Sequence, residues 1–139
     1  MKVFVDTNVL VSAVATRGLC ADVLREVLLS HNPVISRQVT DEITTVLRTK
    51  FGADPELIAE FVQLLRQNAA VAQPTRIPDV ALHDKADLRI LAAAVTSGAD
   101  VLVTGDSELL ELGVLEGVRI ISPRQFWERL RTSKRRRTQ

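Results

Sequence analysis

Short apolar runs alternate with helical patterns along this chain, and this alternation limits most strongly how the chain can fold. The first run, residues 2–5, has no polar residue after its lysine, which is typical of a strand buried on both faces of a parallel sheet. Further short runs lie at residues 33–36, 70–72, 100–104 and 118–122. Because helical patterns separate these runs, the sequence predicts an α/β fold built from right-handed βαβ units. We expect a three-layer α/β/α sandwich with a mainly parallel central sheet.

The predicted helices have apolar stripes and clear start signals. Residues 21–30 place four apolar side chains on one helical face. An Asp-Pro dipeptide at residues 54–55 supplies an N-cap and a first-turn residue for a helix that reaches residue 68. A Ser-Pro dipeptide at residues 122–123 repeats this signal and predicts a last helix before the C-terminus.

The chain is predicted to form one domain followed by a tail. Its length of 139 residues and its hydrophobic content of 46% suit a single core, which we place at residues 1–131. Residues 132–139 contain no apolar residue and are expected to form a basic, disordered tail. The cations of this tail are Lys134, Arg135, Arg136 and Arg137. Because the formal net charge of the whole chain is only +1, the remainder of the chain is mildly acidic.

Cysteine content and hydropathy bear on the compartment. Cys20 is the only cysteine, which excludes an intrachain disulfide and a cysteine-rich zinc site and is typical of a reducing compartment. No stretch approaches the roughly eighteen uninterrupted apolar residues of a membrane span. We therefore expect a soluble, cytoplasmic protein without a membrane partner.

Two aspartates follow predicted strands directly. Asp6 ends the strand in VFVDTN, and Asp106 ends the strand in DVLVTGD. In open α/β sheets the functional crevice lies beyond the carboxyl ends of the strands, so both residues are candidates for a site. Each could instead simply cap the helix that follows, and for either residue alone this possibility stays open.

Glu42 interrupts the apolar stripe of a predicted helix. The stripe consists of Val39, Ile43, Val46 and Leu47, and Glu42 falls on the same face. A buried carboxylate is costly unless it is paired or binds a metal, so we expect Glu42 to face a polar cavity at the end of the stripe. The alternative is that its side chain only reaches out to solvent.

Two further acids begin the stripe of a later helix. Asp84 and Asp87 precede Leu88 and Leu91 on one helical face, so their side chains are expected to point along the core-facing stripe. They could instead interact with the helix dipole, or Asp84 could cap the helix.

Acids from four separate chain regions without matching bases are difficult to explain as salt bridges. We expect them to converge on a cation. Carboxylate oxygens without Cys or His ligands favour Mg²⁺ or Mn²⁺ over zinc, and such sites usually complete their shell with waters and substrate phosphate oxygens. The chemistry that suits this arrangement is metal-assisted hydrolysis of a phosphodiester.

At these residues the sequence resembles the PIN-domain ribonucleases, specifically the small prokaryotic, VapC-like type that is the toxin of a type II toxin–antitoxin pair. VFVDTN resembles the first acidic motif of the family, TDEITTVL its glutamate motif, DKADLRILAAA its third motif and VTGDSELL its fourth. The resemblance extends over residues 1–130, and the four motifs occur in the order of the family.

The resemblance assigns roles to particular residues. The acidic quartet would be Asp6, Glu42, Asp87 and Asp106. Three of these, Asp6, Asp87 and Asp106, would be the ligands of Mg²⁺ or Mn²⁺, while Glu42 would orient a water or assist proton transfer. Auxiliary residues would be Asn8, Thr104, Asp84 and Glu108.

The resemblance also implies partners. We expect a divalent-metal-dependent endoribonuclease that acts on RNA, is neutralised by an antitoxin protein and forms a homodimer. The four cations of the tail are candidate contacts to RNA phosphate, although such a run can equally be a solubilising segment or contact a protein partner.

Other functions stay open from the residues alone. A receiver or phosphatase domain also gathers aspartates beyond parallel strands, but it normally has several acids close together after its first strand, whereas Thr7 and Asn8 follow Asp6 here. A solitary RNA-processing nuclease and a non-catalytic metal- or RNA-binding α/β domain are also compatible with these residues. Metal-dependent cleavage of RNA and of simple phosphoesters separates these classes.

Overall fold

A computed structural model describes residues 1–138 of the protein, with side chains described through Thr132. The strands are β1 (Lys2–Val5), β2 (Asn32–Ser36), β3 (Ala70–Ala72), β4 (Val101–Val103), β5 (Val114–Leu115) and β6 (Val118–Ile121). The helices are α1 (Thr7–Ala15), α2 (Leu19–Ser30), α3 (Arg37–Phe51), α4 (Pro55–Asn68), α5 (Lys85–Thr96), α6 (Ser107–Leu112) and α7 (Pro123–Thr138). The five predicted strands and the predicted helices are all present.

The strands form one sheet in the order β3-β2-β1-β4-β6-β5. All neighbouring strands run parallel except β5 and β6, which are antiparallel. The central strand β1 is buried on both faces, since Val3 and Phe4 are fully buried and Val5 nearly so. This burial confirms the interpretation of the continuous apolar run at residues 2–5.

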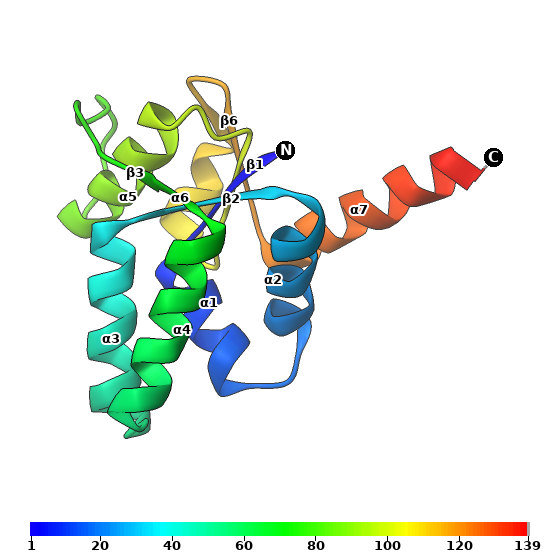
Figure 1. The fold of residues 1–139 in the computed structure, drawn as a ribbon. Coiled ribbons are helices and arrows are strands. Elements are labelled where there is room, and N and C mark those ends of the chain that lie inside the picture. Colours follow the sequence, from blue (N-terminus) through cyan, green and yellow to red (C-terminus); the bar gives the residue numbers. More distant parts are fainter. Residues whose placement is uncertain (139) are drawn as a thin grey trace.

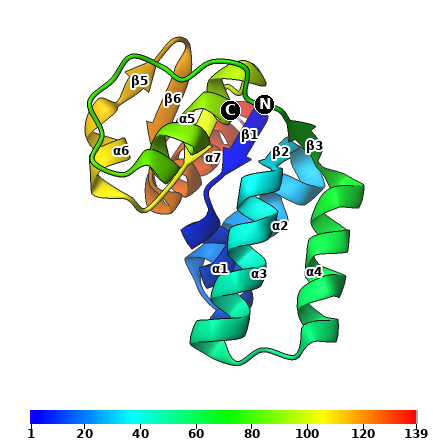
Figure 2. The ribbon, with the colours of Figure 1, turned by 90° about the vertical axis from the view of Figure 1, so that its left-hand side faces the viewer.

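Helices cover both faces of the sheet, which confirms the predicted α/β/α sandwich. On one side α5 packs against β2 and β3, and on the other α2 packs against α7 (Figures 1 and 2). The helices α3 and α4 lie side by side and are joined by a short loop (Figure 2). Helix α3 also contacts α1, which follows β1 directly, so both helices begin beside the carboxyl ends of β1 and β2.

Caps set the starts of the helices. Ser36 accepts from the backbone N–H of Val39 at the start of α3, and Asp54 accepts from Glu56 at the start of α4. At the other end of α3, Gly52 has a φ of 58°, a left-handed conformation that ends the helix at Phe51. The Asp-Pro signal at residues 54–55 therefore predicts the start of α4 correctly.

The strand β5 does not follow from the sequence. It has two residues, too few to show an alternation, and it joins β6 through Glu116 and Gly117, whose φ angles are 46° and 86°. Two successive positive φ angles are the signature of a type I′ hairpin turn. The Glu-Gly dipeptide before the apolar run of β6 is the local signal that points to this hairpin.

The C-terminal helix differs from the expectation for residues 132–139. Helix α7 continues to Thr138, whereas the sequence predicts disorder from Thr132 onward. Lys and Arg are good helix formers, so a helix anchored by the buried Phe126 can continue into a basic segment that has no apolar stripe. The side chains of the four tail cations lie outside the described residues, and the division into a domain and a tail stays a prediction.

The helices of the described residues do not include a membrane span. None of them alone is both long enough and apolar enough to cross a bilayer. Taken together, α1 and α2 meet the length and composition criteria, but the pair is bent by 109°.

Candidate active site

The carboxyl ends of β1 and β4 place Asp6 beside Thr104. Val5 pairs with Val103, and the backbone N–H of Asp6 donates to the Val103 carbonyl at 2.9 Å. The buried hydroxyl of Thr104 donates to Asp6 Oδ2 at 2.7 Å, and the backbone N–H of Thr7 donates to Asp6 Oδ1 at 2.7 Å. Both oxygens of this buried carboxylate are therefore fixed by protein donors.

Asp106 lies at the same edge of the sheet. Its backbone N–H donates to Thr104 Oγ1 at 3.0 Å, so the Thr104 hydroxyl connects Asp106 to Asp6. Asn8 makes a second connection, since its Nδ2 donates to Asp6 Oδ2 at 3.4 Å and its Oδ1 accepts from the backbone N–H of Gly105 at 3.3 Å. Thr104 thus contacts both Asp6 and Asp106, and Asn8 contacts Asp6 and the backbone of Gly105.

Asp6 and Asp106 are also helix N-caps. Asp6 caps α1, and Asp106 Oδ1 accepts from the backbone N–H of Leu109 at 3.1 Å in α6. The interpretation of each residue as a helix cap is therefore correct as far as it goes. Capping accounts for the hydrogen bond to one oxygen of each carboxylate. It does not explain why two capping carboxylates lie at the same edge of the sheet.

Glu42 on α3 faces α1 and is half-buried, as the interrupted stripe predicts. Thr7 Oγ1 donates to Glu42 Oε2 at 2.8 Å, and Gln38 Nε2 donates to Glu42 Oε1 at 2.7 Å. The same Gln38 amide donates to the Ala86 carbonyl at 2.9 Å, which connects α3 to the first turn of α5. Thr7 and Gln38 hold Glu42 inward, and neither residue is predicted from the sequence.

The two acids of α5 differ in their surroundings. Asp84 is exposed and accepts from the backbone N–H of Ala86 at 2.8 Å, which confirms its interpretation as an N-cap. Asp87 is half-buried, and no donor among the described residues makes a hydrogen bond to its carboxylate. Burial, followed by repulsion from Asp106, Asp84, Asp6 and Glu108, raises the pKa of Asp87 to about 7.

Asp6 shares this electrostatic environment. Burial raises the pKa of its carboxyl group, hydrogen bonds from Thr104 and Thr7 oppose that rise, and the charges of Glu42 and Asp106 add to it. Among the described residues, ion pairs form at Asp22 and Glu116, Glu108 contacts His83, and none of these contacts involves a member of the acidic quartet. The edge of the sheet therefore carries negative charge that no described basic side chain neutralises.

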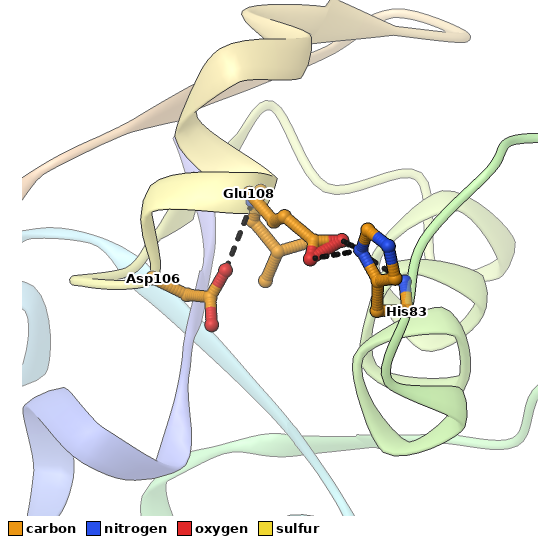
Figure 3. A network of polar contacts seen from close by, with 4 residues as sticks. His83, Asp106 and Glu108 are labelled. Atoms are coloured by element: carbon orange, nitrogen blue, oxygen red, sulfur yellow. Dashed lines mark hydrogen bonds and ion pairs between the residues drawn. The ribbon is translucent and has the colours of Figure 1, made fainter.

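Glu108 is turned toward His83 in the connection that precedes α5 (Figure 3). His83 Nδ1 lies 3.1 Å from both carboxylate oxygens, and the backbone N–H of His83 donates to Glu108 Oε1 at 2.9 Å. These hydrogen bonds, first that of the backbone N–H, lower the pKa of Glu108. No pattern in the sequence indicates this contact, which fixes the connection against the first turn of α6.

A pocket of about 360 Å³ opens between α1 and α3 at this site. It is lined by Asp6, Thr7, Asn8, Val11, Ser12, Glu42, Val46, Lys50, Phe51 and Asp87. Three of the four predicted acids thus face one cavity, while Asp106 is connected to it through Thr104 and Asp6.

The donor set of this site fits a hard divalent cation. The atoms of the pocket lining that could bind a metal are mainly carboxylate oxygens, and no Cys or His belongs to this lining. Within the described part of the chain, no three Asp, Glu, His or Cys side chains are already close enough to hold an ion directly. Mg²⁺ commonly keeps several waters and binds through only one or two carboxylates, so a loosely spaced set of carboxylates is compatible with it.

Comparison with solved structures shows the same fold in three bacterial proteins. VapBC2 from Rickettsia felis, solved with a promoter DNA fragment, matches with a TM-score of 0.64 at 14% identity, over 88% of this chain and 98% of that one. VapBC-1 from nontypeable Haemophilus influenzae matches with a TM-score of 0.61 at 18% identity, over 88% and 98%. VapC20 from Mycobacterium tuberculosis, described as a Sarcin-Ricin loop cleaving toxin, matches with a TM-score of 0.58 at 19% identity, over 84% and 98%.

Comparison at the level of sequence identifies the family. No curated protein matches the chain. The family model for the PIN domain matches residues 2–108, a segment that begins in β1 and ends in the first turn of α6. It therefore contains all four members of the acidic quartet. The chain belongs to the PIN domain family.

Proposed function

We propose that this protein is an endoribonuclease that hydrolyses RNA phosphodiester bonds with Mg²⁺ or Mn²⁺. The observation that carries the proposal is the gathering of unneutralised carboxylates around Asp87 in a chain of the PIN domain family. A phosphodiester is itself an anion, so these carboxylates alone would repel it. A bound cation would reverse the local charge and make the site attractive to RNA.

Asp6, Asp87 and Asp106 are the residues that would hold the ion. An ion of this kind supplies Lewis-acid stabilisation of charge on a phosphate and lowers the pKa of water. The hydrogen bonds from Thr104 and Thr7 orient the Asp6 carboxylate without using all of its lone pairs. Asp87, which receives no hydrogen bond from a described donor, is the acid that gains most from a cation.

Glu42 would orient a water molecule and accept a proton from it. Its two oxygens each accept one hydrogen bond, from Thr7 and from Gln38, and an ionised carboxylate offers about four acceptor positions. The carboxylate is thus held in position and still has capacity for a water. This role agrees with the interpretation of Glu42 as a residue that faces a polar cavity.

The biological setting that we propose is a toxin neutralised by an antitoxin. This part of the proposal draws on the fold shared with the VapBC complexes and with VapC20. The protein would act in the cytoplasm and form a homodimer, for which α4 offers Leu57 and Leu64, both well exposed on its outer face. Lys134, Arg135, Arg136 and Arg137 would add electrostatic contacts to RNA phosphate.

The test is cleavage of a mixed RNA substrate by the purified protein with Mg²⁺, with Mn²⁺ and with excess chelator. We expect cleavage with either metal and none with chelator, and no hydrolysis of a simple phosphomonoester. Cleavage that persists in excess chelator would contradict the metal mechanism. Hydrolysis of the phosphomonoester without cleavage of RNA would favour a phosphatase. Co-expression with the product of a neighbouring small reading frame then distinguishes a toxin, which that product silences, from a solitary nuclease.

A further inference from the structure

The pocket at the acids continues along α3 to a cation and an aromatic ring. Glu42, Val46 and Lys50 are spaced by four residues, so they share one face of α3, and Phe51 follows at the end of the helix. With a rise of 1.5 Å per residue, Lys50 lies about 12 Å along the helix axis from Glu42. The acids and the Lys50–Phe51 pair therefore belong to one pocket but to different ends of it.

Neither Lys50 nor Phe51 is fixed in its place by a side-chain contact to a described residue of the core or to an ion-pair partner. Lys50 makes no ion pair or hydrogen bond with a described residue, although it lies, like Arg48, in the last turn of α3. Phe51 is 55% exposed, so its ring contributes little to the core. Between them and the acids, Val11 and Val46 give the pocket an apolar wall.

We propose that Lys50 and Phe51 bind a nucleotide of single-stranded RNA that neighbours the cleaved phosphodiester. This inference rests on the proposed nuclease function and names the binding site of its substrate. Lys50 would contact the phosphate of that nucleotide, and Phe51 would stack on its base. Aromatic side chains and cations in one groove are the general means by which proteins bind single strands without reading their sequence.

The residues at the Lys50 end of the pocket favour a nucleotide over an apolar ligand. Lys50 is the only cation among its lining residues, and it lies at the end away from the carboxylates. A nucleotide offers an anionic phosphate for Lys50 and a flat ring for Phe51, and the volume of about 360 Å³ is within the range of small-ligand sites. A duplex does not fit this description, because its bases are stacked and inaccessible to Phe51.

The experiment measures binding of a fluorescein-labelled single-stranded RNA of mixed sequence to the full chain with Mg²⁺. All proteins carry Glu42→Gln to slow cleavage, and a gel checks that the RNA stays intact during the measurement. We expect Lys50→Gln and Phe51→Leu each to raise Kd by about tenfold. The slope of log Kd against log salt should fall by about 0.7 for Lys50→Gln, the value of one phosphate contact, and stay unchanged for Phe51→Leu. Phe51→Trp should retain the wild-type affinity.

Two matched variants serve as controls. Arg48→Gln removes a cation from the same helical turn, but Arg48 lines a different pocket, between α3 and α4. Leu29→Ala removes an exposed apolar side chain from α2, outside the acidic pocket. Both should bind RNA like the wild type, and thermal melting of all variants checks that each is folded.

Equal Kd values for Lys50→Gln and Arg48→Gln would overturn the proposal, and so would an unchanged Kd for Phe51→Leu. Loss of affinity for a protein partner without loss of affinity for RNA would assign the pocket to a peptide and overturn it as well. Failure of the nuclease function is a separate outcome, because it appears as absence of metal-dependent cleavage by the wild type. The binding measurement does not depend on cleavage.

Discussion

Individual carboxylates at this site combine a structural and a chemical task. Asp6 and Asp106 each use one oxygen to cap a helix, and the Thr104 hydroxyl connects them. Capping therefore fixes the position of each carboxylate before any ligand binds. It also explains why the local sequence alone could not separate a cap from a ligand, because the same side chain serves both interpretations.

The two residues that hold Glu42 in place could not be predicted from the sequence. The pattern pointed to Glu42 because a carboxylate interrupts an apolar stripe, and the structure places it half-buried beside the pocket. Thr7 and Gln38 had no comparable signal, since a threonine or glutamine is common in any helix. Their importance lies in contacts between α1, α3 and α5, which no local pattern encodes.

Glu42→Gln tests the role of that carboxylate. The substitution removes a proton acceptor, and it replaces one of the two oxygens that accept hydrogen bonds from Thr7 and Gln38 by an NH₂ group. We therefore expect kcat for RNA cleavage to fall by about a hundredfold or more. Asp41→Asn is the matched control, because Asp41 is the exposed neighbouring acid on α3 and should tolerate the change. Full activity of Glu42→Gln would reduce Glu42 to a structural residue.

The raised pKa of Asp87 predicts a pH dependence of stability. The pKa of about 7 in the folded chain lies above the ordinary value near 3.8, so the folded state binds more protons than the unfolded state between these values. The free energy of unfolding of the metal-free protein should therefore decrease as pH rises from about 4 to about 7. Urea unfolding in chelator measures this.

In Asp87→Asn no carboxyl group titrates at this position. We therefore expect the free energy of unfolding to depend less on pH in this variant than in the wild type. Parallel curves for the two proteins would show that Asp87 titrates normally and that the surrounding acids do not act on it.

Elements were more predictable than contacts. The five longer strands and the helices that separate them followed from buried runs, apolar stripes and caps, all of which are properties of neighbouring residues. The short strand β5 was not predicted, because two residues cannot display a period. The full extent of α7 was not predicted either, because a basic segment has helix propensity without an apolar stripe. Hydrophobic patterning predicts elements that have an apolar face, so it gives no signal for a two-residue strand or for a basic helical segment.

The β5–β6 hairpin makes a prediction about its turn. Gly117 has a φ of 86°, where a side chain is strained, so Gly117→Ala should lower the free energy of unfolding by about 1 kcal/mol. Urea denaturation measures the change. RNA cleavage by the folded variant should match that of the wild type, because the turn lies outside the pocket lining. An unchanged stability would mean that the turn adopts a different conformation in solution.

The whole molecule combines a carboxylate site with a basic C-terminal segment. If that segment contacts RNA, deletion of residues 133–139 should weaken RNA binding chiefly at low salt and reduce the log–log salt slope by about 0.7 for each lost phosphate contact. Cleavage at saturating RNA should persist, because the acids are untouched. A slope equal to that of the full chain would assign the segment to solubility or to a protein partner.

The acids at the carboxyl edge of the sheet are proposed to bind a divalent cation, and the whole nuclease function depends on this. Carboxylates that face one cavity repel one another without a metal, so Asp87→Asn and Asp106→Asn should melt at or above the wild type in chelator. Asp54→Asn supplies the control, because Asp54 is also an N-cap aspartate but belongs to α4 and does not line the acidic pocket. Asn is nearly as good a cap as Asp, so each variant keeps its helix start.

The most direct test is the rise in melting temperature that subsaturating Mg²⁺ produces in these four proteins. An ion that binds only the folded state stabilises it by RT ln(1 + [L]/Kd), where [L] is the free ion concentration. Loss of a residue that holds the ion raises Kd and must therefore reduce the rise in melting temperature. We expect a clear rise for the wild type and for Asp54→Asn, and a much smaller one for Asp87→Asn and Asp106→Asn. Equal rises in all four proteins would contradict metal binding at this edge, because neither Asp87 nor Asp106 would then bind the ion.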